Sequence, residues 1–238
     1  MKHFTFKCDN EDNIPDIQLL LTTQSVALGT LIIDSYFAHL PDSPLFMENL
    51  RSLDLCIAIS DAVCLTQLLE SGQQLEILQL GFRLDGSALS SAFRSYRSHS
   101  GPGSFPKLRK FGFTLLEVDT DEDEDPDLFP AVAEFVRAHT VLEALCLSCS
   151  ENSKDFGYTA AIWGVLPSLA HLRTLSMNAP EDLSCALSGW LIPRTVVALD
   201  IQAPEGPFWK GSCDVRMFRT EGILVARYSS LSECRNCC

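Results

Sequence analysis

Basic residues are scarce in this sequence. It contains 18 Lys and Arg against 31 Asp and Glu, which gives a formal net charge of −13 at pH 7. Binding to nucleic acid or to an anionic membrane surface depends on Lys and Arg that lie beside phosphate groups. We therefore expect neither nucleic acid nor a membrane among its partners.

Long apolar runs are also missing. The most apolar stretch, residues 17–33, is interrupted by Gln18 and by the polar run 22–25, whereas a membrane span needs about 20 mostly apolar residues. The acidic segment 9–12 stands where a signal peptide would carry its apolar part, and no N-x-[ST] glycosylation site occurs. We expect an intracellular protein, cytoplasmic or nuclear, whose ten cysteines are reduced.

The sequence carries no motif for catalysis or for metal binding. It has no G-x-S-x-G elbow and no H-x-x-x-H or H-E-x-x-H pattern among its five histidines. Cys234 and Cys237, followed by Cys238, make half of a zinc pattern without a second pair. The sequence predicts no catalytic residue, no cofactor and no metal, and thus a protein that is not an enzyme.

One spacing of apolar residues is abundant instead. The pattern L-x-x-L-x-L at residues 50–55 returns, in strict or looser form, six more times. The seven copies begin at Leu28, Leu50, Leu75, Leu108, Leu142, Leu172 and Val196. Inside each copy buried and outward positions alternate, as in a strand with one buried face.

Segments with helical spacing follow most copies, around residues 65–69, 89–96, 129–136 and 161–166. Alternation of strand and helix predicts parallel strands joined by crossovers. Neighbouring copies begin 22 to 34 residues apart, and three of the six intervals fall in the range of roughly 20–29 residues that is typical of leucine-rich repeats. An open α/β sheet does not need the same triplet on every strand, but a stack of repeats does.

These copies and the helices after them resemble the leucine-rich-repeat proteins, specifically the irregular repeats in the substrate-binding half of fungal F-box proteins. The resemblance covers residues 22–205. It implies an α/β leucine-rich-repeat solenoid, a horseshoe of about seven irregular repeats with a parallel concave sheet and helices on the convex side. We expect residues 1–211 to form this domain and residues 212–238 to form a C-terminal cap and a cysteine-containing tail.

The sequence departs from the family at the site three residues after each triplet, where the family has Asn or Cys. The residues found there are Ala58, Arg83, Leu116, Ser150, Pro180 and Pro204. We therefore expect individual, irregular loops in place of an asparagine ladder.

The resemblance implies a protein that binds a protein partner on the concave face. The outward residues of the strands would form that face: Ser52, Asp54, Ile77, Gln79, Lys110, Gly112, Ala144, Cys146, Thr174, Ser176 and Asp200, with Thr30, Ile32 and Ala198 at the ends.

Three functions stay open. The chain could be the substrate-recognition part of an F-box-type ubiquitin-ligase receptor, a stand-alone structural or regulatory repeat protein, or an α/β enzyme without a recognisable motif. No F-box fits before Leu28, so a ligase adaptor is expected only if an F-box is supplied upstream.

Two further features have alternative interpretations. The acidic run 119–127, which includes Asp121, Glu122, Asp123, Glu124 and Asp125, is either a solvated insertion, a docking loop for a basic partner or a calcium site. His139 and His171 each precede a triplet at positions that we expect to match between neighbouring repeats. They are either turn histidines at helix ends or a pair that the stack brings together.

Overall fold

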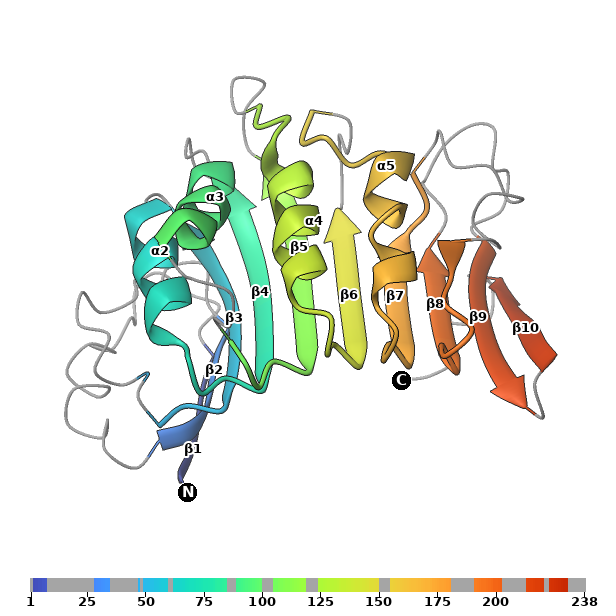
Figure 1. Ribbon diagram of the computed structural model, residues 1–238, viewed down its shortest axis with the longest axis horizontal. Helices are drawn as coiled ribbons and strands as arrows, with labels where there is room; N and C mark the ends of the chain where they lie inside the picture. Colours follow the sequence, from blue (N-terminus) through green and yellow to red (C-terminus); the bar gives the residue numbers. More distant parts are fainter. Residues whose placement is uncertain are drawn as a thin grey trace.

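A single sheet of ten strands, in the order of the sequence, organises the chain (Figure 1). The computed structural model describes residues 2–7, 28–34, 47, 49–59, 62–84, 89–99, 105–118, 124–149, 155–180, 191–202, 213–220 and 223–230. The C-terminal cysteines Cys234, Cys237 and Cys238 lie outside these ranges.

The strands are β1 (Lys2–Lys7), β2 (Leu28–Asp34), β3 (Ser52–Ile59), β4 (Ile77–Leu84), β5 (Lys110–Val118), β6 (Ala144–Cys149), β7 (Thr174–Asn178), β8 (Ala198–Gln202), β9 (Cys213–Thr220) and β10 (Ile223–Ser230). The helices are α2 (Ala62–Ser71), α3 (Leu89–His99), α4 (Leu128–Ala138) and α5 (Ala160–Trp163), with the short 3-10 helix η4 (Leu166–Ser168) after α5.

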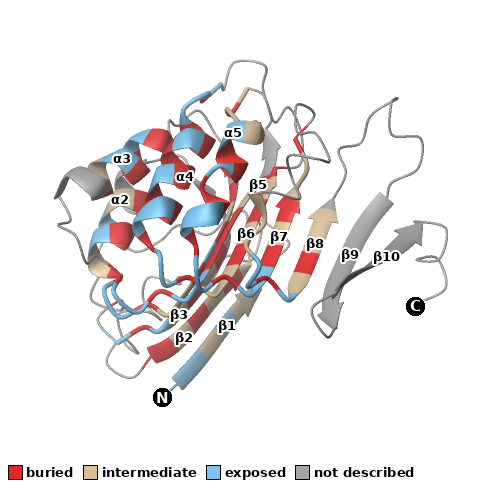
Figure 2. Ribbon diagram, turned by 45° about the vertical axis from the view of Figure 1, so that its right-hand side comes forward, coloured by how far each residue is buried: buried red, intermediate tan, exposed pale blue. Residues whose placement is uncertain are grey.

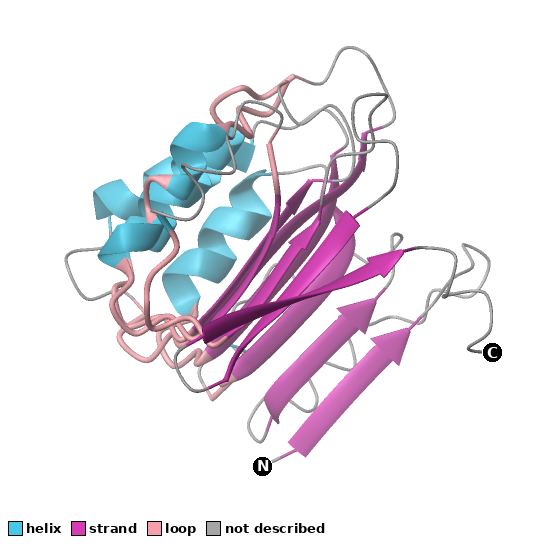
Figure 3. Ribbon diagram, turned by 90° about the vertical axis from the view of Figure 1, so that its right-hand side faces the viewer, coloured by secondary structure: helices cyan, strands magenta, loops and turns pink. Residues whose placement is uncertain are grey.

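Strands β1 to β8 are all parallel, and β9 and β10 add an antiparallel hairpin to β8. Helices α2 to α5 form one layer, and Figure 3 shows this layer on a single face of the sheet. The predicted α/β order, with helices between parallel strands, is confirmed. This hairpin lies in the segment 212–238 and covers the edge of β8.

The seven copies of the triplet pair with one another residue for residue. The middle apolar positions form one row across β2 to β8: Leu31, Leu53, Leu78, Phe111, Leu145, Leu175 and Leu199. The last apolar positions form the next row: Ile33, Leu55, Leu80, Phe113, Leu147, Met177 and Ile201. Every member is buried except Ile201, which is half-buried. Figure 2 shows this burial between the sheet and the helices.

Strands β3 to β8 are each preceded by the same tight turn. The backbone N–H of the first apolar residue donates to the carbonyl three residues earlier, as in the pair Leu142 and His139 at 3.2 Å. The other carbonyls in this position belong to Met47, Gly72, Phe105, Leu169 and Pro193. The turn buries the first apolar residue and sets the register at which the strand begins.

His139 and His171 do not occupy matching positions relative to this turn, so the expectation that they would was wrong. His139 lies three residues before its triplet, is buried, and makes a hydrogen bond of 2.7 Å from its Nδ1 atom to the carbonyl of Phe135. His171 lies one residue before its triplet and is exposed. The two residues therefore occupy different positions of the repeat.

The helix predicted around residues 161–166 is shorter than expected. Helix α5 ends at Trp163 and is followed by Gly164. Pro167 has no backbone N–H to donate to the carbonyl of Trp163, four residues earlier, so α5 does not extend through it. The chain accordingly continues as the single 3-10 turn of η4.

Aromatic side chains fill the middle of the core. The ring of Phe113 lies 5.9, 5.6 and 5.5 Å from the rings of Phe82, Phe93 and Phe129, each in an edge-to-face arrangement. Phe82 and Phe113 come from strands, and Phe93 and Phe129 from α3 and α4. This cluster joins neighbouring repeats through both layers.

Replacing Phe113 with Ala should lower the free energy of unfolding by about 3–5 kcal/mol, because it leaves a cavity between two strands and two helices. Chemical denaturation measures this loss. Phe113→Leu should cost clearly less, since it keeps most of the buried apolar volume. Equal losses for the two variants would contradict the role given to the aromatic cluster.

Candidate binding face

The predicted outward residues come together on the face of the sheet opposite the helix layer, here called the open face. One outward row consists of the residues that come one position before the middle apolar residue of each triplet. Its members are Thr30, Ser52, Ile77, Lys110, Ala144, Thr174 and Ala198. The next outward row contains Ile32, Asp54, Gln79, Gly112, Cys146, Ser176 and Asp200. All are exposed or half-buried except Gly112. Their alignment was predictable because strand side chains alternate strictly.

The centre of the open face contains two glycines, Gly112 and Gly81, on adjacent strands. A Cβ atom on Gly112 would lie 3.4 Å from Cγ of Gln79 and 3.7 Å from Cβ of Cys146, so these neighbours flank and bury the glycine. A Cβ atom on Gly81, in β4, would lie 3.6 Å from Sγ of Cys56. Gly112 is therefore covered by its neighbours, whereas Gly81 is half-buried.

Cys146, Ser176 and Asp200 are consecutive members of one row, on β6, β7 and β8. Burial raises the pKa of the Cys146 thiol, a hydrogen bond with Ser176 offsets part of that rise, and the charge of Asp200 adds a smaller rise. The thiol is therefore protonated at neutral pH, and only the thiolate is strongly nucleophilic. This position offers a small polar contact rather than a reactive group.

The acidic run is only partly described. Asp121, Glu122 and Asp123 lie outside the described residues, and Glu124 is exposed. Asp125 differs from a solvated loop residue because it is buried, with its Oδ2 atom 3.0 Å from the backbone N–H of Ser90 that donates to it.

This bond ties α3 to the segment that leads into α4. Ser90 is in the first turn of α3, whose backbone N–H groups have no acceptor within the helix. A carboxylate there also interacts favourably with the helix dipole. Asp127 forms a second link between the same elements, an exposed ion pair of 3.1 Å with Arg94.

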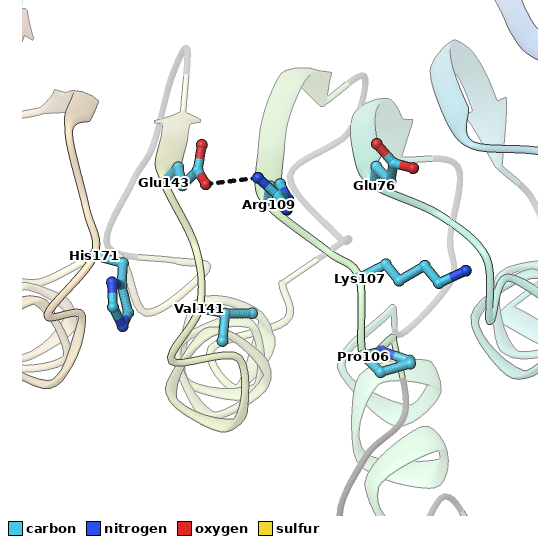
Figure 4. Close-up of a pocket in the computed structure, with 7 residues that line it drawn as sticks. All are labelled: Glu76, Pro106, Lys107, Arg109, Val141, Glu143 and His171. Carbon is cyan, nitrogen blue, oxygen red and sulfur yellow. Dashed lines mark hydrogen bonds and ion pairs between the residues drawn. The ribbon is translucent and has the colours of Figure 1, made fainter.

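Sequence reasoning missed a groove where the strands begin, shown in Figure 4. It has a volume of about 470 Å³ and is lined by Glu76, Pro106, Lys107, Arg109, Val141, Glu143 and His171. The lining residues lie within two residues of the first apolar positions Leu75, Leu108, Leu142 and Leu172, which precede β4 to β7. Three of them, Glu76, Arg109 and Glu143, could have been found from the second residue of the five central triplets, which alternates in charge: Arg51, Glu76, Arg109, Glu143 and Arg173.

Ion pairs join some of these neighbours. Nη1 of Arg109 lies 3.1 Å from Oε1 of Glu143, and Nη1 of Arg51 lies 3.5 Å from Oε1 of Glu76. Both pairs are substantially exposed, so each contributes at most about 1 kcal/mol to stability.

Over the ranges that the structure describes, no group of three or more His, Cys, Asp or Glu side chains is placed to hold a metal ion. The described helices include none with the length and apolar character of a membrane span. Comparisons with protein-family models, with curated proteins and with solved structures gave no match.

Replacing Asp125 with Ala should lower the free energy of unfolding by about 1–3 kcal/mol, because it leaves a buried N–H of α3 without its acceptor. Thermal or chemical denaturation measures the change. Asp125→Asn keeps an acceptor oxygen and should recover part of the loss, and Glu124→Ala, at the exposed neighbour, should have almost no effect. Equal effects at positions 124 and 125 would contradict the capping role.

Cys146 should make the protein less stable as pH rises into the alkaline range. The pKa of its thiol is raised in the folded protein, so the unfolded chain loses this proton first and alkaline pH favours unfolding. The contribution is intact below the pKa of the unfolded thiol. Stability measured against pH should fall less steeply in Cys146→Ala. An identical alkaline slope in both proteins would contradict this assignment.

Proposed function

We propose that the chain is a leucine-rich-repeat solenoid that binds a protein partner across the open face. The observation that carries this proposal is the unbroken register of two outward rows over the seven strands β2 to β8. Such a surface offers side chains at a regular spacing of roughly 4.8 Å between strands. Repeat proteins use surfaces of this kind for recognition.

The chemistry of the face favours a protein over a small ligand. Its outward rows combine small side chains, the amide of Gln79, one cation at Lys110 and carboxylates at Asp54 and Asp200. The polar groups among them can form the rim of an interface. A broad, mostly shallow surface is suited to many weak contacts rather than to enclosure of one molecule.

Within this function, the resemblance of the triplets favours substrate recognition for an F-box-type ubiquitin-ligase receptor. The open face would bind the substrate, and an F-box supplied upstream would bind the adaptor. Purification of the protein from its native cells tests this link. Recovery of a cullin–RING adaptor supports it, and a partner complex without adaptor supports a stand-alone scaffold.

The double substitution Gln79→Arg with Lys110→Glu should weaken binding of the partner recovered from those cells by at least about tenfold, or about 1.4 kcal/mol. Both side chains are exposed on the open face, so the enlarged and reversed charges obstruct docking without disturbing the core. Calorimetry or surface plasmon resonance measures the affinity, and denaturation confirms unchanged stability.

A matched control places the same charge changes on the helix layer. Gln67→Arg with Arg137→Glu alters exposed residues of α2 and α4 and should leave the affinity unchanged. Full binding by the open-face variant, or an equal loss in the control, would move the binding site away from the open face.

A further inference from the structure

The turns that lead into the strands form a rim whose charge is opposite to that of the chain. This strand-start rim consists of residues 49–51, 72–76, 105–109, 139–143, 169–173 and 193–197. Its cations are Arg51, Lys107, Arg109, Arg173 and Arg194, and its only carboxylates are Glu76 and Glu143. The rim is thus a cationic strip on a protein with a net charge of −13.

The groove described above lies in the middle of this rim. Nζ of Lys107 donates to the neutral Oε1 atom of Gln74 at 2.6 Å, which fixes the ammonium group without neutralising its charge. Arg109 is held by Glu143 on the next repeat. His171 lines the other end of the groove, and Figure 4 shows Val141 between it and Lys107.

Exposed apolar side chains are found on the same rim. Among the residues that the structure describes, the large hydrophobic side chains that are exposed are Val141 and Val197, at 46% and 48%. Both belong to the strand-start rim, one just before and one just after the first apolar position of its repeat. The rim therefore combines positive charge with apolar contact area.

We propose that the strand-start rim is a second docking surface, which takes an extended acidic segment of a partner protein and packs one of its apolar side chains against Val141. From β5 to β7 two spacings between strands amount to roughly 10 Å. About three residues of extended chain cover this distance. An acidic segment could thus reach from Lys107 to Arg173 while its middle residue contacts Val141.

Charge complementarity favours an acidic segment of a partner protein as the ligand of the strand-start rim. Long-range attraction between an acidic segment and the cationic strip would guide it to the rim, while the remainder of the acidic chain repels it. The apolar contact then distinguishes the segment from a simple counterion. The main competing occupant is the acidic run 119–127 of a second copy of this chain.

The test uses a fluorescein-labelled peptide of Glu and Asp with one central Leu, and fluorescence anisotropy with the full chain. Arg173→Glu should weaken binding by at least about tenfold and reduce the dependence of affinity on salt. Arg137→Glu makes the same change of charge at an exposed residue of α4 and should alter the affinity by less than about twofold. Equal weakening by both variants would mean attraction to net charge only and would overturn the proposal.

The apolar contact is tested separately with a second peptide in which Gly replaces the central Leu. Val141→Ser should weaken binding of the Leu peptide and leave binding of the Gly peptide unchanged, which is the coupling expected of two groups in contact. The open-face variant Gln79→Arg with Lys110→Glu should bind both peptides normally, so a failure at one surface is distinguishable from a failure at the other.

Two results would overturn the rim assignment. One is an unchanged affinity of Val141→Ser for the Leu peptide. The other is self-association of the unmodified chain in sedimentation experiments that Arg173→Glu abolishes, because the occupant would then be a second copy of the chain.

Discussion

The constraint on which this structure depends is that each strand starts at the same height as the strand before it. For β4 to β8, the backbone carbonyl at the second position of the preceding triplet enforces it. The carbonyl of Arg51 accepts the N–H groups of Glu76 at 2.7 Å and Ile77 at 3.0 Å, and the same forked bond recurs at every later repeat up to β8. A shift of one residue would break this ladder and turn every buried side chain to the wrong face.

The same constraint produces the two surfaces for which we propose binding functions. Because register is kept, outward residues of the same position form continuous rows over seven strands, and the residues beside each entry turn form a continuous rim. The helices contribute differently, since they close one face and leave the other free for contacts. The Asp125 carboxylate shows how an irregular insertion is fitted into this plan: it caps α3 from the segment before α4 and thereby joins two repeats.

Sequence periodicity predicted the parts that repeat. The triplets placed β2 to β8 and both outward rows, since strand alternation needs only the spacing of Leu53 and Leu55 or their equivalents. Sequence periodicity gave the wrong prediction where a single local feature decides the local structure. Pro167 shortened the fourth predicted helix, and the turn geometry separated His139 from His171. The burial of Asp125 and the rim groove depend on contacts between distant segments, although the alternating charges of the second triplet position were present in the sequence.

The central claim, that the open face is the surface covered by a protein partner, is tested most directly by carboxylate footprinting of the complex isolated from native cells. The account predicts that Asp54 and Asp200, on the open face, lose reactivity toward a water-soluble carbodiimide when the partner is bound, and that Glu70 and Glu134, on the helix layer, do not. Protection of Glu70 and Glu134 with unchanged Asp54 and Asp200 would contradict it.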